Sequence, residues 1–170
     1  MPGDSDIGKK AEKKIQEWLD RPEDGYSFDR IKDQMTGFYG SSNICDFTCF
    51  KSPHMYYIES KATYEDRFDF KMLTETQHDG LLDKSKIQNV YGIVIVLFAL
   101  YKRAFVIDIR EIKRLEDLDV KSLNIKKRDK KGWPCLSAEI KTIPNNRKHL
   151  LDYVGEIEDY ISYLEGDELQ

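Results

Sequence analysis

The first apolar pattern in the chain has helical spacing. Its members recur every three or four residues: Ile7, Ala11, Ile15, Trp18 and Leu19. This spacing predicts a helix that Ser5 or Asp6 caps and that Pro22 ends. Residues 25–43 follow as a polar stretch that contains glycines, and we expect a long loop there. A loop of that length in a compact domain is usually functional or mobile.

Two alternating runs follow, over residues 44–50 and 55–62, and both are rich in β-branched and aromatic residues. Ser52-Pro53 lies between them as a turn signal, so the pattern predicts a β-hairpin. Further on, residues 74–77 have the form Thr-x-x-Gln of a capping box, which predicts the start of a second helix.

The longest apolar run, residues 90–100, predicts a strand that is buried on both faces, with residues 103–109 as its partner. A short helix near residues 111–118 is expected next. A last amphipathic helix carries Leu150, Leu151, Val154, Ile157, Ile161 and Leu164. This order of elements predicts an α/β fold, with a central mixed sheet flanked by helices.

Length and composition narrow the class of protein. The 170 residues suit one domain over 1–170, with residues 166–170 as a disordered tail. Lys and Arg total 27 against 31 Asp and Glu, and a net charge of −4 does not favour a polyanion partner. No apolar run is long enough to cross a bilayer. Residues 1–6 have neither a basic region nor an apolar signal core, so we expect a cytoplasmic protein.

The three cysteines, Cys45, Cys49 and Cys135, lack the CxxC spacing of a zinc site, so we expect buried thiols. Three separated histidines also match no metal-ligand spacing, and we assign no chemistry to them: His54, His78 and His149.

The hairpin brings charged residues together. A turn centred on Ser52-Pro53 places Asp46 opposite Glu59, and Lys61 lies two positions further along the same face. Opposed side chains in a sheet have Cβ atoms roughly 4.5–5.5 Å apart, so two carboxylates would meet. Such a pair destabilises a sheet unless a cation joins it.

Two interpretations of this cluster stay open. In the first, the carboxylates bind Mg²⁺, and the Lys61 ammonium holds an attacking water or neutralises charge that develops on a phosphate. In the second, Asp46, Glu59 and Lys61 form a salt cluster on a solvated sheet face, which costs little free energy.

The segments Asn43-Ile44-Cys45-Asp46 and Tyr57-Ile58-Glu59-Ser60-Lys61 together resemble the PD-(D/E)xK nuclease motif. More closely, residues 8–151 are similar to the RecU-like Holliday junction resolvases and their phage relatives, also called penicillin-binding-protein-related factor A. The supporting features are Gly8-Lys9 with Glu12, the thirteen-residue step from Asp46 to Glu59, the segment 74–77 and the segment Tyr91-Gly92-Ile93-Val94.

This resemblance implies a restriction-endonuclease-like core, dependence on Mg²⁺ or Mn²⁺, a homodimer, and hydrolysis of DNA phosphodiesters. It implies that Asp46 and Glu59 are metal ligands, together with the Ser60 carbonyl. Lys61 would be the water-positioning base or an electrostatic stabiliser.

Two more residues are implied as site residues, and each has an ordinary alternative. Glu12 would be an additional acid from the first helix, or a solvated helix residue. Gln77 would approach the site from the second helix, or act only as a capping residue.

Candidate DNA-binding residues lie in three places. Lys9 in the first helix either meets phosphate or is solvated. Residues 29–43 are shorter than the stalk of the RecU-like family, and Arg30, Lys32 and the tip 37–40 form either a reduced DNA-contacting projection or a structural loop. A basic segment beside Trp133 is either a phosphate-tracking surface or a solvated hairpin tip: Lys121, Lys126, Lys127, Arg128, Lys130 and Lys131.

The leading hypothesis is therefore a Mg²⁺-dependent endonuclease that resolves four-way or branched DNA in recombination or repair. One alternative is a less structure-selective PD-(D/E)xK nuclease of the repair or restriction type. The other is a DNA-binding module that keeps the fold and has lost catalysis.

Overall fold

The computed structural model describes residues 4–20, 22–32, 43–127 and 137–140. The α-helices in these ranges are α1 (Asp4–Leu19), α2 (Glu75–Lys84) and α3 (Ile109–Asp117). The strands are β1 (Ser27–Arg30), β2 (Phe47–Lys51), β3 (His54–Thr63), β4 (Arg67–Asp69), β5 (Val90–Phe98), β6 (Arg103–Asp108), β7 (Ser122–Asn124) and β8 (Ser137–Ile140). Short 3-10 turns are η1 (Pro22–Asp24), η2 (Phe70–Met72), η3 (Ala99–Tyr101) and η4 (Ile125–Lys127).

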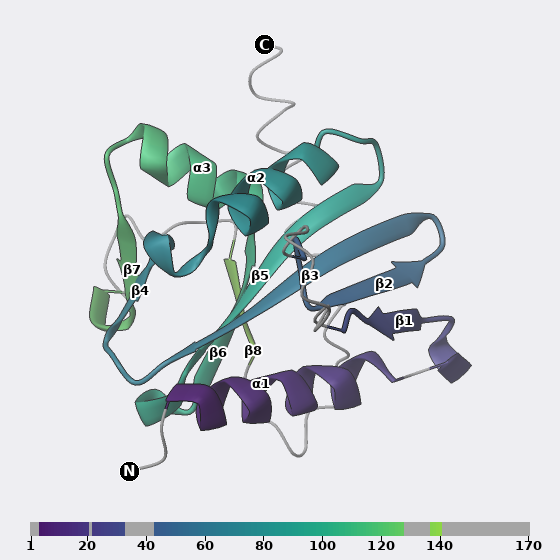
Figure 1. The fold of residues 1–170 in the computed structure, drawn as a ribbon, viewed down its shortest axis with the longest axis horizontal. Coiled ribbons are helices and arrows are strands. Elements are labelled where there is room, and N and C mark those ends of the chain that lie inside the picture. Colours follow the sequence, from purple (N-terminus) through teal and green to yellow (C-terminus); the bar gives the residue numbers. More distant parts are fainter. Residues whose placement is uncertain (1–3, 21, 33–42, 128–136, 141–170) are drawn as a thin grey trace, which may run out of the picture.

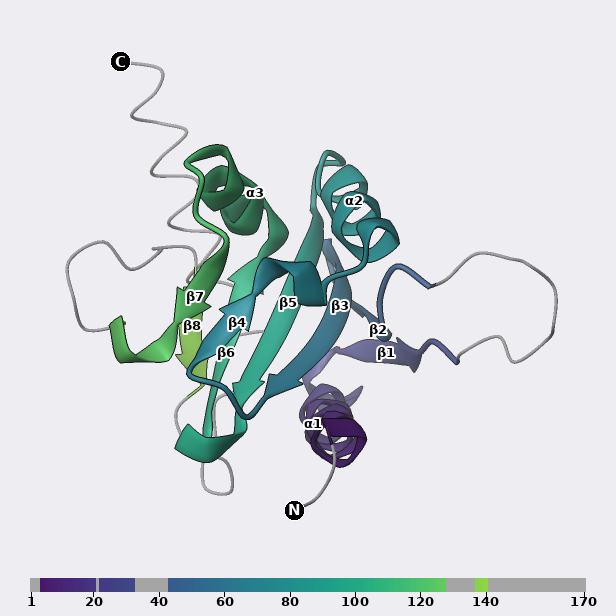
Figure 2. The same cartoon turned by 60° about the vertical axis from the view of Figure 1, so that its left-hand side comes forward.

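A six-stranded sheet forms the centre of the molecule, in the order β1-β2-β3-β5-β6-β8. β3 and β5 run parallel, and every other neighbouring pair in this sheet is antiparallel. Helix α1 lies below the sheet in Figure 1, and α2 and α3 lie on the opposite side together with the small β4–β7 sheet. Figure 2 gives the same arrangement with α1 nearly end-on. The prediction of an α/β fold with a central mixed sheet flanked by helices is confirmed.

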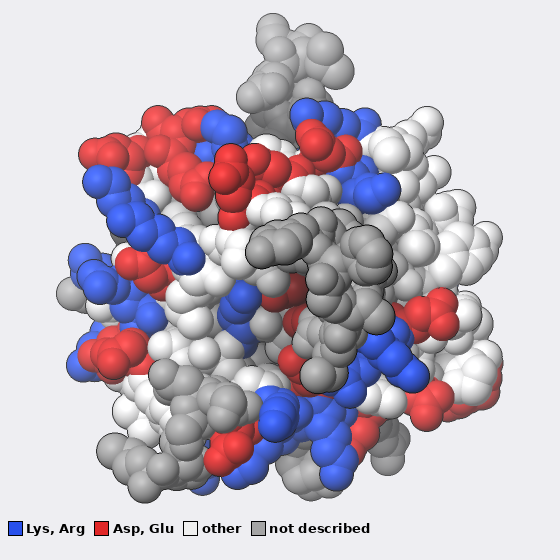
Figure 3. Space-filling model, in the orientation of Figure 1, with Lys and Arg blue, Asp and Glu red and all other residues white. Residues whose placement is uncertain are grey.

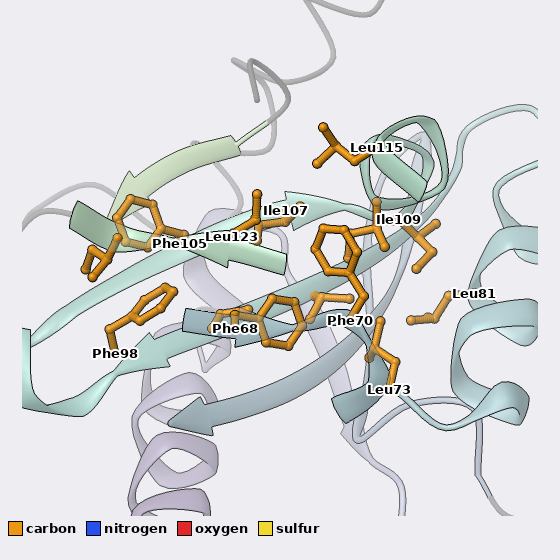
Figure 4. Packing of buried hydrophobic residues seen from close by; sticks show 14 of the residues in the cluster. Phe68, Phe70, Leu73, Leu81, Phe98, Phe105, Ile107, Ile109, Leu115 and Leu123 are labelled. Carbon is orange, nitrogen blue, oxygen red and sulfur yellow. The ribbon is translucent and has the colours of Figure 1, made fainter. Parts of the chain in front are cut away.

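Each face of the sheet has its own apolar cluster. On the α1 side, Ile15 and Leu19 pack with Ile58, Ile93 and Val106. The cluster on the other face joins β5 and β6 to α2, α3 and the β4–β7 sheet (Figure 4). Because successive strand residues point to opposite faces, β5 contributes to both clusters, as its continuous apolar run predicts.

Helix α2 is fixed at its start by the predicted capping box. The Thr74 hydroxyl accepts from the Gln77 amide at 3.2 Å, and the Gln77 side chain accepts from the Thr74 amide at 3.0 Å. Further along, two glycines let α2 approach its neighbours closely. A Cβ on Gly80 would lie 2.4 Å from Ile44 Cγ2, and one on Gly92 of β5 would lie 2.6 Å from the Leu81 carbonyl oxygen.

Two expectations about the first sixty residues are wrong. Ser5 and Asp6 do not cap the first helix, because α1 runs from Asp4 and contains both. The expected loop over residues 25–43 contains strand β1, which pairs with β2 at the sheet edge. β1 has four residues with mostly exposed side chains, so it lacks the alternation that marks a half-buried strand.

Cys45 and Cys49 are buried, as expected, and burial raises the pKa of each thiol to about 12. Among the described residues, no helix has the length and apolarity needed to span a membrane. Several predictions fall outside the described residues: the tip 37–40, the helix over residues 150–164, the tail 166–170, and Trp133, Cys135 and His149.

Candidate active site at the end of the hairpin

The hairpin has the register that its turn predicts. Phe47 pairs with Ile58, and the pairing continues without a slip to Lys51 and His54. At Asp46 the ladder breaks: its amide donates to the Ile58 carbonyl at 3.0 Å, and its carbonyl accepts from the Ile31 amide at 2.8 Å. In a regular strand both groups of one residue point to the same neighbour. Asp46 is therefore not the ladder partner of Glu59, and this part of the prediction is wrong.

The break still brings Asp46 to the second half of β3. β3 continues to Thr63, although its pairing with β2 ends at Ile58. The open edge is used by Asp46, whose Oδ2 accepts from the Ser60 amide at 2.9 Å. The amide N–H and the carbonyl of one strand residue point to the same side of the strand. Since the Ser60 amide points to Asp46, the Ser60 carbonyl also points to the edge where Asp46 lies.

Glu59 is buried on the face that α2 covers, with 2% of its surface exposed. Its Oε1 accepts from Gln77 Nε2 at 2.7 Å and lies 3.0 Å from Lys61 Nζ. Its Oε2 is buried and has no hydrogen-bond partner. A buried carboxylate oxygen without a partner costs free energy, so the interpretation as a solvated salt cluster is wrong.

The charge around Glu59 is unfavourable. Burial raises its pKa, and the Asp46 carboxylate raises it further. Lys61 lowers it by charge and hydrogen bond, Glu12 raises it slightly, and the result is a pKa of about 8. This carboxyl group therefore ionises less readily than an ordinary glutamate, and a divalent cation would favour its ionised form.

These residues suit a hard divalent cation. The two carboxylates and a backbone carbonyl are oxygen donors, and Mg²⁺ commonly takes few protein ligands and keeps several waters. Within the described ranges, no three His, Cys, Asp or Glu side chains form a group that could hold a metal ion. A metal here would therefore depend on Asp46, Glu59, the Ser60 carbonyl and water. The unpartnered Glu59 Oε2 is the oxygen left for it.

Gln77 combines the two roles that its sequence position leaves open. Its Oε1 completes the capping box, and its Nε2 donates to Glu59. Since the amide has one oxygen and one nitrogen, the capping bond turns the nitrogen toward Glu59. The cap therefore fixes the orientation of the side chain as well as the helix start.

Glu12 and Arg30 lie at the margin of the site. Arg30 Nη2 lies 2.6 Å from Glu12 Oε2, which ties the end of β1 to α1. The Glu12 side chain is 27% exposed, and its charge reaches Glu59 strongly enough to raise the pKa of that group. Glu12 is therefore near the site, although it contacts Arg30 there.

The described candidate DNA-binding residues lie on separate elements. Lys9 is exposed on α1, and Lys126 and Lys127 are exposed in η4, where Lys126 pairs with Asp66. Arg128, Lys130 and Lys131 lie outside the described residues. In Figure 3, Lys and Arg atoms gather along the lower edge over α1, whereas Asp and Glu predominate along the upper edge over α3 and the start of α2.

His78, to which the sequence analysis assigns no chemistry, makes two close contacts with carboxylates. His78 Nδ1 lies 2.8 Å from Asp79 Oδ1, and Nε2 lies 2.8 Å from Glu116 Oε2 in α3. No sequence signal identifies this cluster, because Glu116 is 38 positions away and belongs to another helix.

Comparisons with known proteins give likenesses among solved structures. No family model matches the chain, and no curated protein matches it. The structure is similar to that of Archaeoglobus fulgidus Hjc, a Holliday junction resolvase from an archaeal hyperthermophile. The TM-score is 0.49 and the identity 14%, over 70% of this chain and 89% of that chain. A likeness of this size says nothing about activity.

Proposed function

We propose that this chain is a metal-dependent endonuclease that cleaves DNA, with four-way or branched DNA as its substrate. The observation that carries the proposal is the environment of Glu59. This carboxyl group is buried, its Oε2 has no partner, and its pKa stands at about 8 beside Asp46. Such an arrangement lowers stability in the absence of a cation and suits a site that binds one.

The roles of the residues follow from their contacts. Asp46, Glu59 and the Ser60 carbonyl would hold Mg²⁺ or Mn²⁺. Gln77 and Lys61 both engage Glu59 Oε1, so they hold the carboxylate with Oε2 turned away from them. The Lys61 ammonium is then placed to hold an attacking water or to stabilise negative charge on the phosphate.

The metal, when bound, would lower the pKa of a coordinated water and neutralise phosphate charge. Glu12 would add a third negative charge close to the metal site. Its ion pair with Arg30 would then have to loosen, which would release the guanidinium toward a DNA phosphate.

DNA would be held by phosphate contacts around the site. Lys9 and Arg30 lie on the elements that border it, and Lys126 and Lys127 would contact phosphates further away. Arg128, Lys130 and Lys131 would extend the second group. We propose a homodimer, because two copies of one site can nick the two symmetric strands of a junction.

The test is cleavage of a synthetic four-way junction and of a linear duplex of matching sequence, with Mg²⁺ and with EDTA. We expect faster cleavage of the junction, loss of cleavage in EDTA, and loss in Asp46→Asn. The matched control is Asp83→Asn, which removes an exposed carboxylate on α2 that pairs with Lys86. This variant should cleave as the unchanged protein does.

Each other outcome has a definite meaning. Equal cleavage of junction and duplex would leave a nuclease without structure selectivity. Undiminished cleavage by Asp46→Asn would contradict the proposed site. DNA binding without cleavage at any metal concentration would favour a non-catalytic DNA-binding module.

A further inference from the structure

His78 joins helices α2 and α3. Its ring lies between Asp79 of α2 and Glu116 of α3, at 2.8 Å from each carboxylate. The side chain is 18% exposed. An ionised carboxylate can only accept hydrogen bonds, so both ring nitrogens must donate. With both carboxylates ionised, the two contacts suit the doubly protonated, positively charged ring.

His78 directly follows Gln77, whose side chain contacts Glu59. The His78 amide donates to the Thr74 carbonyl at 2.9 Å, within the first turn of α2. The same turn contains Gln77, whose Nε2 reaches Glu59. A displacement of this turn away from α3 would therefore also move the Gln77 amide.

The surroundings of the ring are mostly acidic. It borders a cavity of about 410 Å³ between α2, η2 and the chain after α3, with an apolar floor that includes Phe70 and Leu73. The charged groups at this cavity, besides His78, are Glu75 and Asp79 from α2, Glu116 from α3, Asp119, Lys71 from η2, and Lys121. Four carboxylates against two lysines favour a protonated ring.

We propose that His78 is a positioning residue, which bridges Asp79 and Glu116 and thereby holds the first turn of α2 against α3, with the Gln77 amide on Glu59. The effect of this bridge on DNA cleavage rests on the proposed function. The bridge itself is a property of the fold and can be tested without any activity.

The bridge depends on pH. Burial lowers the pKa of His78, but the hydrogen bonds to Asp79 and Glu116 outweigh burial and leave this pKa above its ordinary value. The bridge is therefore complete at low pH and is lost as the pH rises through the raised pKa. At a pH above this pKa, one nitrogen of the neutral ring has no proton, and its lone pair would face a carboxylate.

The first measurement is amide hydrogen exchange of residues 74–78, expressed as protection factors at several pH values. In the unchanged protein we expect protection to fall as the pH rises from about 6 to about 9. In His78→Gln, protection should be lower at low pH and should vary little with pH. Asp83→Asn, which breaks an exposed pair with Lys86 on the same helix, should follow the unchanged protein.

A second variant keeps the test independent of any misfolding of His78→Gln. Glu116→Gln can still accept a hydrogen bond from the ring but has no charge. We expect the pKa of His78, measured by NMR, to fall in this variant, and the loss of protection to begin at lower pH. Protection factors in His78→Gln that equal those of the unchanged protein at every pH would overturn the proposal.

Cleavage kinetics separate positioning from binding. His78→Gln should lower kcat by about tenfold and leave KM for the DNA substrate within about twofold. An unchanged kcat together with reduced protection would show that the bridge does not act on the site, and would overturn the positioning role. If the unchanged protein cleaves no DNA, the proposed function fails, and the exchange data still decide whether the bridge exists.

Discussion

Among the residues that the structure describes, three carboxylates are almost fully buried, and their surroundings are of two kinds. Asp108 and Glu111, at the start of α3, are each 1% exposed, and each faces an arginine from its own helix. Both oxygens of Glu111 accept from Arg114, at 2.6 and 2.8 Å. Both oxygens of Asp108 accept from Arg110, and Asp108 also caps the helix. Among the described residues, Glu59 has no arginine partner, and its Oε2 has no hydrogen-bond partner.

The difference separates structural from functional burial. A carboxylate that serves the fold is buried with a charge-matched partner that satisfies both oxygens. At Glu59, burial and the neighbouring carboxylates raise the pKa to about 8, although Lys61 opposes the shift. The buried Glu59 carboxyl group therefore adds no stability to the fold. A bound cation would make its charge favourable instead of unfavourable.

The largest expected effect concerns cleavage. Glu59→Gln keeps the size of the side chain but removes its charge, so it should lower the cleavage rate about a hundredfold or more, as loss of a metal ligand does. Glu111→Gln should leave the cleavage rate per folded molecule nearly unchanged. Single-turnover cleavage with saturating Mg²⁺ measures both, and equal losses in the two variants would break the contrast.

The second effect concerns stability and has the opposite order. Glu111→Gln removes one partner of a hydrogen-bonded pair at a buried position, so it should lower the free energy of unfolding by roughly 1–3 kcal/mol. Glu59→Gln removes a destabilising charge and should leave this free energy unchanged or raise it. Urea denaturation at pH 8 without metal gives both values. A large loss in Glu59→Gln would mean that Glu59 supports the fold.

The third effect is the pH dependence of stability. The pKa of Glu59 lies at about 8 in the folded chain against an ordinary value of 4.5, so the unfolded chain releases the proton first as the pH rises. The stability contributed by the protonated group is complete below about pH 4.5 and is lost as the pH rises through about 8. Over this interval the unchanged protein should lose a few kcal/mol more than Glu59→Gln.

The raised pKa of His78 contributes a loss in the same direction to both proteins, so this contribution cancels in their difference. Identical pH profiles for the two proteins would contradict the raised pKa of Glu59.

A smaller effect tests how α2 is positioned. A Cβ at Gly80 would lie 2.4 Å from Ile44 Cγ2, so Gly80→Ala must displace α2 or the segment before Asp46. We expect a loss of roughly 1–2 kcal/mol in unfolding free energy, since overpacking exceeds the gain in helix propensity. Adding Ile44→Ala should recover much of this loss. If Ile44→Ala restores neither the unfolding free energy nor the cleavage rate, the contact with Ile44 is not the cause of the loss.

The smallest effect concerns DNA binding away from the site. Lys127 is exposed, and its expected role is a phosphate contact. Lys127→Ala should weaken junction binding modestly and reduce the slope of log K against log salt by about 1. Glu111→Gln should leave the slope unchanged. Fluorescence anisotropy over a range of salt concentrations measures it, and an unaltered slope in Lys127→Ala would remove this residue from the DNA interface.

The sequence predicts the hairpin well because its turn and its alternation agree. Ser52-Pro53 fixes the register, and the register brings Asp46 to the part of β3 that carries Glu59 and Lys61. The capping box predicts the start of α2 and indicates that Gln77 lies at its first turn. Local patterns are sufficient for these features, because each depends on residues close together in the chain.

Other features depend on contacts that no local pattern encodes. The break at Asp46 requires Ile31 beside it, and β1 is too short and too exposed to show a strand period. The burial of Glu59 results from α2 packing over its face of the sheet, which the hairpin alone does not reveal. The bridge from His78 to Glu116 joins two helices across 38 positions.

The most direct test of the account is an NMR titration of the Glu59 carboxyl carbon with and without Mg²⁺. Without the metal, the account predicts a pKa of about 8. With millimolar Mg²⁺, this pKa should fall, because the cation favours the ionised form. In Asp46→Asn, the pKa without metal should be lower and Mg²⁺ should change it little. A pKa near 4.5 without metal, or a value near 8 that Mg²⁺ does not change, would contradict the claim that Glu59 is part of a metal site.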